Sequence, residues 1–295
     1  MRNIVLQIFI TLFLFTLQAQ ADEKISRIAF SAEHEGGLHI FDVSSGVIEP
    51  VDVGMFNIGK IEYNRKRNLL VFEGSHEHGN PRSLYLYDLE QKTKRIIYEA
   101  KSFEDILFRP KFFPTGEFIY ALNYTKGIFR YDINNNSWEK IEIKNSNSPI
   151  YQGLSFSDSG NRVALSPANF KGVLIAEVKE KEFIVSEDVL TDFRSCISPR
   201  WLDDENIVFA GRKEAGLQYV WKVLLKNSKL QQLTKKPVGS RDNLDVSPDK
   251  KTIVFTGTSE PLEWRLWKIN VDGSGLEQLT KGGTLSSHLS PVWLD

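Results

Sequence analysis

The chain has 295 residues, and its 37 lysines and arginines nearly balance its 38 aspartates and glutamates, which gives a formal net charge of −1 at pH 7. This balance offers no electrostatic basis for binding nucleic acid or an anionic membrane, so we expect neither as a partner. Cys196 is the only cysteine, so no disulfide forms within the chain. Its apolar neighbours favour a buried, unreactive thiol over a nucleophile.

The first 21 residues have the pattern of a secretory signal peptide. Arg2 precedes an apolar run from Ile4 to Leu17, and a small-residue cleavage pattern follows at Ala19-Gln20-Ala21. The apolar run is shorter than the roughly 20 residues that a membrane-spanning helix needs. We therefore predict that residues 1–21 are removed and that a soluble protein, residues 22–295, is exported to the periplasm or secreted. Retention of the segment as an anchor is the alternative.

Two kinds of strand recur along the rest of the chain with a period of about 45 residues. The first kind is a short run of β-branched and apolar residues that follows a turn, at residues 27–30, 69–72, 118–121, 162–165, 206–209 and 252–255. The second kind lies at residues 38–42, 84–88, 128–132, 173–178, 219–224 and 265–270. Three of these strands end on an aspartate expected to cap the following turn: Asp42, Asp88 and Asp132. Repeats of this length are typical of β-propeller blades.

The repeat is clearest between Leu244 and Thr280. A short apolar run is stopped by the turn Ser247–Lys250, and Thr252–Thr256 then reads as a strand. Trp264–Val271 alternates apolar and polar residues up to a hairpin turn that begins at Asp272, and Leu276–Thr280 forms a fourth strand. Such a four-stranded meander cannot bury both faces alone, so it must stack on neighbouring copies.

The two ends of the chain predict how the ring closes. The first repeat has no inner strand before Arg27, whereas the final residues Ser290–Asp295 match Ser198–Asp203, the inner strand of the fifth repeat. We therefore predict that the C-terminal strand completes the first blade, which removes the exposed sheet edges of an open array. The predicted fold is an all-β, six-bladed propeller with four antiparallel strands per blade, in a single domain.

The stretch from Ser247 to Thr280 is similar to the repeat of the TolB-like propellers, also described as WD40-like or PD40 repeats. That repeat has an SPDG turn, an apolar strand, a strand ending in an Asp-Gly-Ser turn, and a final Leu-Thr. The resemblance extends over the whole predicted mature chain and is weakest in blades two to four, where residues 64–67, 113–116 and 157–160 replace SPDG. TolB itself carries an α/β domain before its propeller, and we expect this chain to consist of the propeller alone.

Three histidines are candidate metal ligands. His76 and His78 lie in a long polar loop between Glu73 and Arg82, and His34 lies in the equivalent loop of the first blade. Imidazoles with carboxylates nearby can bind Zn²⁺ or another divalent metal. The alternative is that these side chains are solvated loop residues. No other cofactor is predicted.

The inner strands provide a second set of candidates. Apolar residues or prolines are expected to pack between blades: Ile61, Pro110, Leu154, Pro199, Leu244 and Pro291. The alternate positions are mostly polar and are expected to line the channel: Lys60, Glu62, Arg109, Lys111, Ser155, Arg200, Asn243, Asp245 and Ser290. The basic residues could bind a carboxylate, or they could pair across blades, with Arg200 and Asp245 as the obvious pair. Above them, residues expected to rim the mouth are Tyr151, Gln152, Arg194, Arg241, Asp242 and His288.

No catalytic motif is found, because Gly273-Ser274-Gly275 lacks nucleophile-elbow spacing and no H-E-x-x-H or phosphate-binding loop exists. We therefore predict a monomeric, non-catalytic module that binds a protein or peptide at the channel mouth. The resemblance leaves an enzyme open, because some TolB-like propellers are lyases of uronate oligosaccharides or accessory domains of peptidases. A metal-dependent lyase or hydrolase of an acidic oligosaccharide or peptide is the alternative. Its predicted metal ligands are His34, His76, His78 and His288, and its carboxylate-binding residues Arg109, Arg200 or Arg241.

Overall fold

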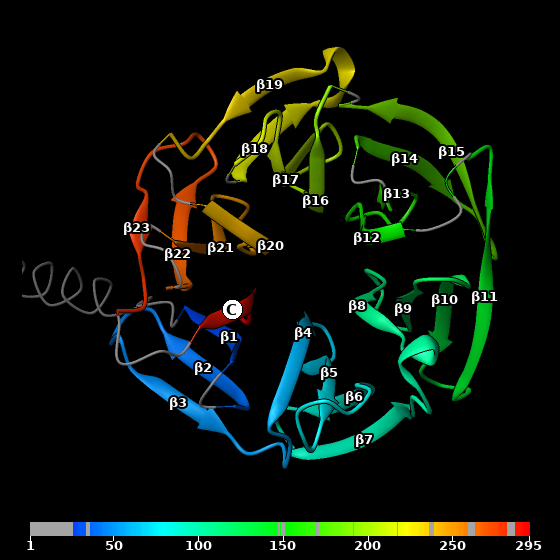
Figure 1. The fold of residues 1–295 in the computed structure, drawn as a ribbon, viewed down its shortest axis with the longest axis vertical. Coiled ribbons are helices and arrows are strands. Elements are labelled where there is room, and N and C mark those ends of the chain that lie inside the picture. The colour runs from blue at the N-terminus through cyan, green and yellow to red at the C-terminus, as the bar shows by residue number, and fades with distance from the viewer. Residues whose placement is uncertain are drawn as a thin grey trace, which may run out of the picture.

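The strands of the computed structural model are arranged radially around a central axis (Figure 1). The structure describes residues 26–33, 36–146, 148, 151–168, 171–190, 192–216, 218–235, 239–258, 263–281 and 287–295, with the backbone alone at 239–243. Over these residues the regular elements are strands, apart from two short 3₁₀ helices, η1 (Phe103–Asp105) and η2 (Leu225–Asn227). None of the described helices has the length and apolar character needed to span a membrane.

Four of the sheets have four strands, and each of these runs outward from an inner strand. The first, in order outward, contains β24 (His288–Trp293), β1 (Arg27–Ala32), β2 (Leu38–Asp42) and β3 (Ile48–Val51). The second contains β4 (Asn57–Asn64), β5 (Leu69–Ser75), β6 (Ser83–Asp88) and β7 (Thr93–Tyr98). Another contains β16 (Ser195–Trp201), β17 (Asn206–Arg212), β18 (Tyr219–Leu224) and β19 (Lys229–Gln232). The last contains β20 (Gly239–Val246), β21 (Thr252–Thr258), β22 (Arg265–Asn270) and β23 (Glu277–Gln278).

The remaining described strands form one eight-stranded sheet. Its two halves are β8 (Phe108–Phe112), β9 (Phe118–Asn123), β10 (Gly127–Asp132) and β11 (Ser137–Lys144), then β12 (Tyr151–Phe156), β13 (Arg162–Pro167), β14 (Val173–Val178) and β15 (Glu182–Val189). The outermost strands of the halves, β11 and β15, pair in parallel, with Ile143 opposite Phe183. This differs from the prediction of separate four-stranded blades, because these two edge strands are long enough to meet outside the ring.

The predicted closure of the ring is confirmed by the pairing of β24 with β1. The two strands are antiparallel, with Ile28 opposite Trp293 and Ala32 opposite His288. An ion pair fastens the same junction, because the Arg27 guanidinium lies 2.5 Å from the Asp295 carboxylate and the Arg27 backbone N–H donates to that carboxylate at 2.7 Å. The C-terminal strand therefore covers the inner edge that the N-terminal strand would otherwise expose.

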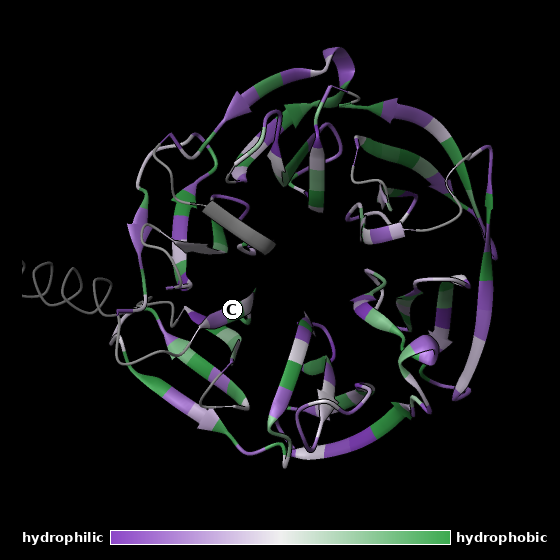
Figure 2. Ribbon diagram, in the orientation of Figure 1, coloured by the Kyte–Doolittle hydropathy of each residue, from purple (hydrophilic) through white to green (hydrophobic). Residues whose placement is uncertain are grey.

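The hydrophobic core lies between neighbouring sheets, where the predicted apolar strands are fully buried. In one cluster, Val208 of β17 packs with Leu244 of β20 and Phe255 of β21, and all three are inaccessible to solvent. Every predicted member of both strand families lies within a strand of the structure. Figure 2 shows the resulting mixture of apolar and polar positions along the coloured strands.

The predicted aspartate caps are confirmed at the three turns. The Asp42 carboxylate accepts hydrogen bonds from the backbone N–H groups of Ser44 (2.8 Å) and Ser45 (3.0 Å). Asp88 and Asp132 make the equivalent pairs of bonds to residues two and three positions ahead. The hydrogen bonds from Ser44 and Ser45 lower the pKa of Asp42, because they favour its ionised form.

Candidate functional site

Six inner strands surround the centre of the ring: β4, β8, β12, β16, β20 and β24 (Figure 1). We call the space that they enclose the channel, and we call the end at which these strands begin the mouth. The predicted packing positions on these strands are buried, with Ile61 3% exposed, Leu154 1% exposed and Leu244 fully buried. The alternation of the inner strands therefore directs polar side chains toward the channel.

The inner strands leave the regular hydrogen-bonded ladder near the mouth. Each of them shows a register shift against its neighbour, between residues 58 and 61, 108 and 111, 151 and 153, 197 and 200, 240 and 244, and 289 and 292. A β-bulge leaves one or more residues unpaired and re-aims their side chains. The bulges therefore place a second set of side chains at the mouth, outside the regular alternation.

Three of the bulges share a local sequence in which a residue with positive φ precedes a proline. Arg109 has φ 51°, Ser198 has φ 50° and Ser290 has φ 56°. This left-handed region is uncommon for residues with a Cβ, and the proline that follows cannot donate to the ladder. The bulge of β4 uses glycine, since a Cβ at Gly59 would lie 2.4 Å from the Glu73 carboxylate.

Glu73 supports the bulge of β8 from the neighbouring sheet. Its carboxylate is buried and accepts a hydrogen bond of 2.7 Å from the backbone N–H of Arg109. The Arg82 guanidinium lies 3.8 Å from the same carboxylate. Sequence reasoning missed this role, because Glu73 reads only as the start of a polar loop.

Below the bulges, four charged side chains form a connected network that we call the plug: Glu62, Lys111, Arg200 and Asp245. The Glu62 carboxylate pairs with the Lys111 ammonium, and it lies 3.0 Å from Nη2 of Arg200. Nε of Arg200 donates to Asp245 at 3.2 Å, which confirms the predicted pair. Asp245 also accepts a hydrogen bond from the backbone N–H of Trp293 at 2.9 Å.

The plug joins inner strands that are not neighbours in the ring. Glu62 is on β4 and Arg200 is on β16, so their contact crosses the channel. The four side chains are 12% to 17% exposed, and the two positive charges balance the two negative charges. Because each charge is paired at low exposure, the plug closes the channel with groups whose burial is compensated.

The position of Lys111 in the plug lowers its pKa. Burial, and then repulsion by the Arg200 guanidinium, lower the pKa of Lys111 to about 8, against an opposing effect of Glu62. Removal from water disfavours the charged form of an amine, as does a neighbouring cation. Lys111 is therefore less strongly held in its charged form than an ordinary surface lysine.

A small cavity lies between the bulges and the plug, and we call it the mouth pocket. Its volume is about 20 Å³, and nine described residues line it: Lys60, Ile61, Arg109, Pro110, Lys111, Gly153, Leu154, Ser198 and Arg200. The pocket thus brings two predicted site residues, Arg109 and Arg200, to one place. Ser198 is a lining residue that the sequence did not single out, although Ser-Pro within a strand is a signal for a bulge.

Two predicted rim residues lie at the mouth with accessible side chains. Gln152 falls in the bulge of β12 and is half-buried, and Arg194 is exposed in the segment that precedes β16. Arg241, Asp242 and Asn243 lie in β20 within its bulge, but their side chains are outside the described part of the structure. The predicted arrangement of these residues around the mouth stays a prediction.

Tyr151 and His288 differ from the expectation that they rim the mouth. Tyr151 is 2% exposed, packs in a hydrophobic cluster and donates its hydroxyl to Ser146 at 2.7 Å. His288 is 7% exposed, and its Nδ1 lies 2.8 Å from the Thr280 hydroxyl. Both residues begin their inner strands, as expected for the mouth, but their side chains point into the packing between the sheets and not into the channel.

Burial sets the protonation state of His288. Removal from water lowers the pKa of His288 to about 4, with smaller contributions from Arg265 and His39. The ring also packs against Phe30, with the ring centroids 4.8 Å apart. At neutral pH the imidazole is therefore neutral and is held as part of the packing at the start of β24.

The predicted metal ligands are not brought together among the described residues. His76 and His78 are exposed, and the His78 ring meets Phe56 edge-on with the ring centroids 5.0 Å apart. His34 lies outside the described residues, and within the described part no three histidine, cysteine or acidic side chains form a metal-binding group. Cys196 is buried, and burial raises the pKa of its thiol, in agreement with an unreactive role.

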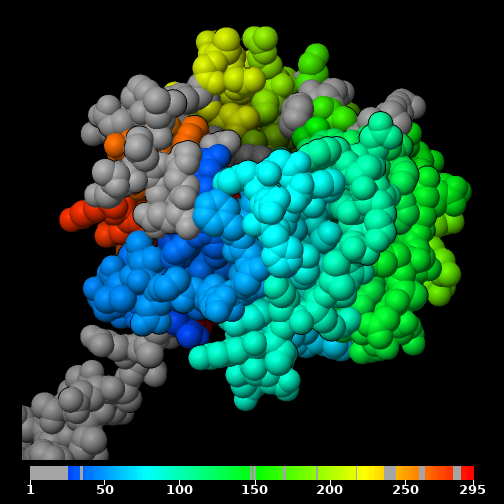
Figure 3. Space-filling model, turned by 60° about the horizontal axis from the view of Figure 1, so that its bottom comes forward, coloured from blue at the N-terminus to red at the C-terminus, as the bar shows by residue number. Residues whose placement is uncertain are grey.

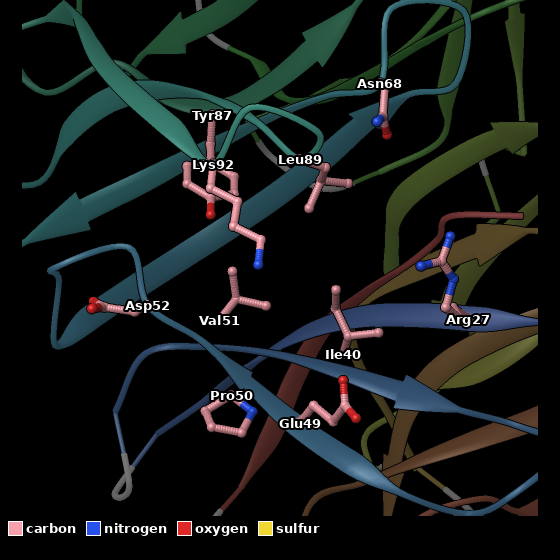
Figure 4. A pocket seen from close by; sticks show the side chains of 10 residues that line it. All are labelled: Arg27, Ile40, Glu49, Pro50, Val51, Asp52, Asn68, Tyr87, Leu89 and Lys92. Atoms are coloured by element: carbon pink, nitrogen blue, oxygen red, sulfur yellow. The ribbon is translucent and has the colours of Figure 1, made fainter.

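A larger cavity lies away from the channel, between the first two sheets. Its volume is about 670 Å³, and Figure 4 shows that one wall comes from β3 and the other from the end of β6 and the turn beyond it. The walls carry both charges, with Glu49 and Asp52 on one and Lys92 on the other. Figure 3 shows the outer surface of the ring, where the parts of the chain coloured blue, cyan and teal adjoin one another.

No protein-family model and no curated protein matches this sequence. Solved structures similar to the chain include TolB from Acinetobacter baumannii, with 15% identity and a TM-score of 0.72 over 91% of this chain and 66% of that one. A structure assigned to TolB from Agrobacterium tumefaciens has 13% identity and a TM-score of 0.64, over 86% of this chain and 89% of that one. This chain spans about two thirds of the length of the Acinetobacter protein.

An oligogalacturonate lyase in complex with manganese is also similar, with 12% identity and a TM-score of 0.51 over 87% of this chain and 74% of that one. At such identities the likeness shows the fold alone. Together with the radial sheets, the neighbours show that this chain has a β-propeller fold, which it shares with the TolB structures.

Proposed function

We propose that the chain is an exported, six-bladed TolB-like propeller that binds a protein or peptide segment at its channel mouth without catalysing a reaction. Each half of the eight-stranded sheet repeats the four-strand order of the other sheets, which supports a count of six blades with four strands each. The signal peptide pattern of residues 1–21 supports export to the periplasm or the medium. The neighbouring TolB structures support an interaction module in general.

The plug is the observation that carries this proposal. Because Glu62, Lys111, Arg200 and Asp245 are paired across the channel, a ligand that enters from the mouth meets a closed floor. The available contact surface is then the ring of bulges, with Gln152 and Arg194 accessible at its edge. Arg109 and the β20 residues Arg241, Asp242 and Asn243 belong to the same proposed surface, while the buried Tyr151 and His288 pack beside it at the start of β12 and β24.

Partner capture by mouth variants tests the proposal. Immobilised mature protein is compared with the double variant Gln152→Arg/Arg194→Glu and with Lys140→Glu, a charge change on the exposed face of β11. The backbone N–H of Arg194 bonds to the Arg212 carbonyl, so a side-chain change there leaves the strand pairing in place. We expect the double variant alone to lose its partner from an envelope extract. Equal recovery by all three proteins would refute a binding role for the mouth.

An enzyme is the second candidate, and the similarity to a manganese-containing oligogalacturonate lyase is the observation that favours it. In that case the protein would be a metal-dependent lyase or hydrolase of an acidic oligosaccharide or peptide. His34, His76 and His78 would be its metal ligands, and Arg109 and Arg200 would hold substrate carboxylates. Calorimetric titration with Mn²⁺ and Zn²⁺, on the mature protein and on His76→Ala/His78→Ala, tests it. Metal binding that the variant loses would support the enzyme, and absence of binding would remove the metal-dependent candidate.

A further inference from the structure

The larger cavity between the first two sheets, which we call the side groove, contains a buried hydroxyl that lacks a described partner. Tyr87 lines this groove and is 3% exposed, and no described residue donates a hydrogen bond to its hydroxyl or accepts one from it. Figure 4 shows the hydroxyl directed from β6 toward Val51 on the opposite wall. Buried polar groups are nearly always hydrogen-bonded, so an unpaired hydroxyl that faces a cavity indicates a site for a ligand.

The seam between the second and third sheets shows how the same position is completed elsewhere in the ring. Tyr131 is the equivalent of Tyr87, because each precedes the aspartate that ends the third strand of its sheet. Nη1 of Arg95, from the outer strand of the second sheet, donates to the Tyr131 hydroxyl at 2.8 Å and to Oδ1 of Asn136 at 2.7 Å. We call this arrangement the closed seam, and in it a guanidinium satisfies the tyrosine.

The side groove has a carboxylate where the closed seam has that guanidinium. Glu49 lies opposite Ile40 in the first sheet, and Arg95 lies opposite Leu86 in the second. Ile40 and Leu86 both lie two residues before the aspartate that ends their strand, so Glu49 occupies the place of Arg95. No described residue pairs with the Glu49 carboxylate. The side groove therefore presents the counter-charge of a guanidinium in the position where the closed seam supplies one itself.

The charges that line the side groove leave room for one cation. Lys92 takes the place of Asn136 in the turn before the outer strand, where the two residues have φ 52° and 50°. Its ammonium opposes two carboxylates, those of Glu49 and Asp52. Arg27, the other basic lining residue, is already ion-paired at the C-terminal junction. The lining thus has one more negative charge than it has unpaired positive charges, which favours an added cation.

The floor of the side groove suits an aliphatic stem. Ile40, Val51 and Leu89 are half-buried at the edge of the hydrophobic cluster between these sheets. An arginine side chain packs its methylene groups on such a surface while its guanidinium makes hydrogen bonds. Pro50, which is exposed on the same edge, has no N–H to offer to an incoming strand. A single side chain, and not an added β-strand, is therefore the element that fits.

We propose that the side groove binds an arginine side chain of a partner polypeptide, with the guanidinium between the Tyr87 hydroxyl and the Glu49 carboxylate and the stem on the apolar floor. The partner supplies the group that Arg95 supplies in the closed seam. This inference goes beyond the proposed function, because the side groove lies at the end of the ring opposite the mouth. Asn68, one of its lining residues, is in the turn that follows the end of β4.

The test measures the binding of four probes to the mature protein by NMR titration at low ionic strength. The probes are an acetylated alanine pentapeptide amide with arginine at its centre, the same peptide with citrulline or with lysine instead, and guanidinium chloride. Citrulline has the shape of arginine without its charge, so we expect the arginine peptide to bind about tenfold more tightly. Equal binding of the citrulline or lysine peptide, or no binding of the arginine peptide, would overturn the proposal. Guanidinium chloride that binds as tightly as the arginine peptide would mean an adventitious ion only, which overturns it as well.

Two conservative variants locate the bound guanidinium. Tyr87→Phe removes only the hydroxyl and Glu49→Gln only the charge, and each should weaken binding of the arginine peptide about tenfold. Because the Tyr87 hydroxyl has no described partner, Tyr87→Phe should leave the thermal unfolding midpoint unchanged, which separates a binding role from a structural one. Glu142→Gln on β11 and the mouth variant Gln152→Arg/Arg194→Glu should bind the peptide as the wild type does. Full affinity in both groove variants would contradict the assignment to the side groove.

Copying the closed seam into the side groove provides the opposite test. Glu49→Arg/Lys92→Asn introduces the side-chain types of Arg95 and Asn136 beside Tyr87. We expect the introduced guanidinium to occupy the site, so that the arginine peptide binds at least tenfold more weakly and the thermal midpoint rises by about 2 °C. Unchanged binding of the peptide by this variant would show that the guanidinium is held elsewhere and would refute the proposal.

Discussion

The inner strands are built differently at their two ends. In the plug, the strands keep their regular alternation, and four charged side chains satisfy one another across the channel. At the mouth, a few residues earlier in the same strands, the bulges break the ladder and place side chains outside the regular alternation. The repeat thus builds a closed scaffold, and the features suited to recognition occur where the repeat is interrupted.

The largest effect is expected from breaking the plug. Glu62→Gln removes the shared partner of Lys111 and Arg200 and leaves two cations facing each other at 13% and 12% exposure. Removing one partner of a buried ion pair costs about 3 to 5 kcal/mol, because the remaining charge is not compensated. We expect a loss of this size in the free energy of unfolding, measured by chemical denaturation.

The matched control is Glu142→Gln, which removes an exposed partner of Lys144 on β11. Exposed pairs contribute about 0 to 1 kcal/mol, so this change should be nearly neutral. If the two variants lose the same stability, the plug is not a buried network and the contrast between the two ends is wrong.

A smaller effect concerns the protonation of His288 at the mouth end of β24. The pKa of His288 is about 4 in the folded protein and 6.5 in an unfolded chain, so the unfolded state binds the proton first as pH falls. The contribution of His288 to stability is therefore complete above pH 6.5 and decreases down to pH 4, by about 3 kcal/mol.

The measurement is the unfolding free energy of the wild type minus that of His288→Gln as a function of pH. Glutamine retains a polar partner for Thr280 but does not titrate, so the difference isolates the imidazole. A difference that stays constant between pH 7 and pH 4 would show that His288 takes up its proton at the same pH in the folded and unfolded chains, so that burial does not lower its pKa.

The smallest effect tests the backbone of the bulges. Ser290 has φ 56° and is 3% exposed, so Ser290→Gly removes the cost of a left-handed residue with a Cβ. We expect a gain of about 0.5 kcal/mol in unfolding free energy. Ser155→Gly, on the regular part of β12, should instead lose about 0.5 to 1 kcal/mol. The same sign at both positions would contradict the assignment of strain to the bulge.

Most of the scaffold could be predicted from the sequence, because its signals are local. Turn residues and β-branched runs fix the strands, and the match between Ser290–Asp295 and Ser198–Asp203 predicts the pairing of β24 with β1. The parallel contact of β11 with β15 could not be predicted, since it joins two edge strands that carry no local signal for each other.

The channel was only partly predictable for a related reason. Alternation gives the buried and channel-facing positions and the Arg200–Asp245 pair, because these residues lie on the regular part of the strands. The contact of Arg200 with Glu62 depends on the diameter of the ring, which no local pattern specifies. The burial of Tyr151 and His288 could not be predicted from their place at the start of β12 and β24, because the direction of a side chain beside a bulge does not follow the regular alternation. The prolines at 110, 199 and 291 were the available signal for the bulges of β8, β16 and β24.

Site-specific photo-crosslinking in cells that export the protein tests the central claim most directly. A photoreactive amino acid is placed at Gln152 or Arg194 at the mouth, and at Lys140 on the outer strand β11. Peptide or protein binding at the mouth predicts crosslinked partners from positions 152 and 194 and none from position 140. Crosslinks from position 140 alone would contradict it and place the interaction surface on the outer wall of the ring.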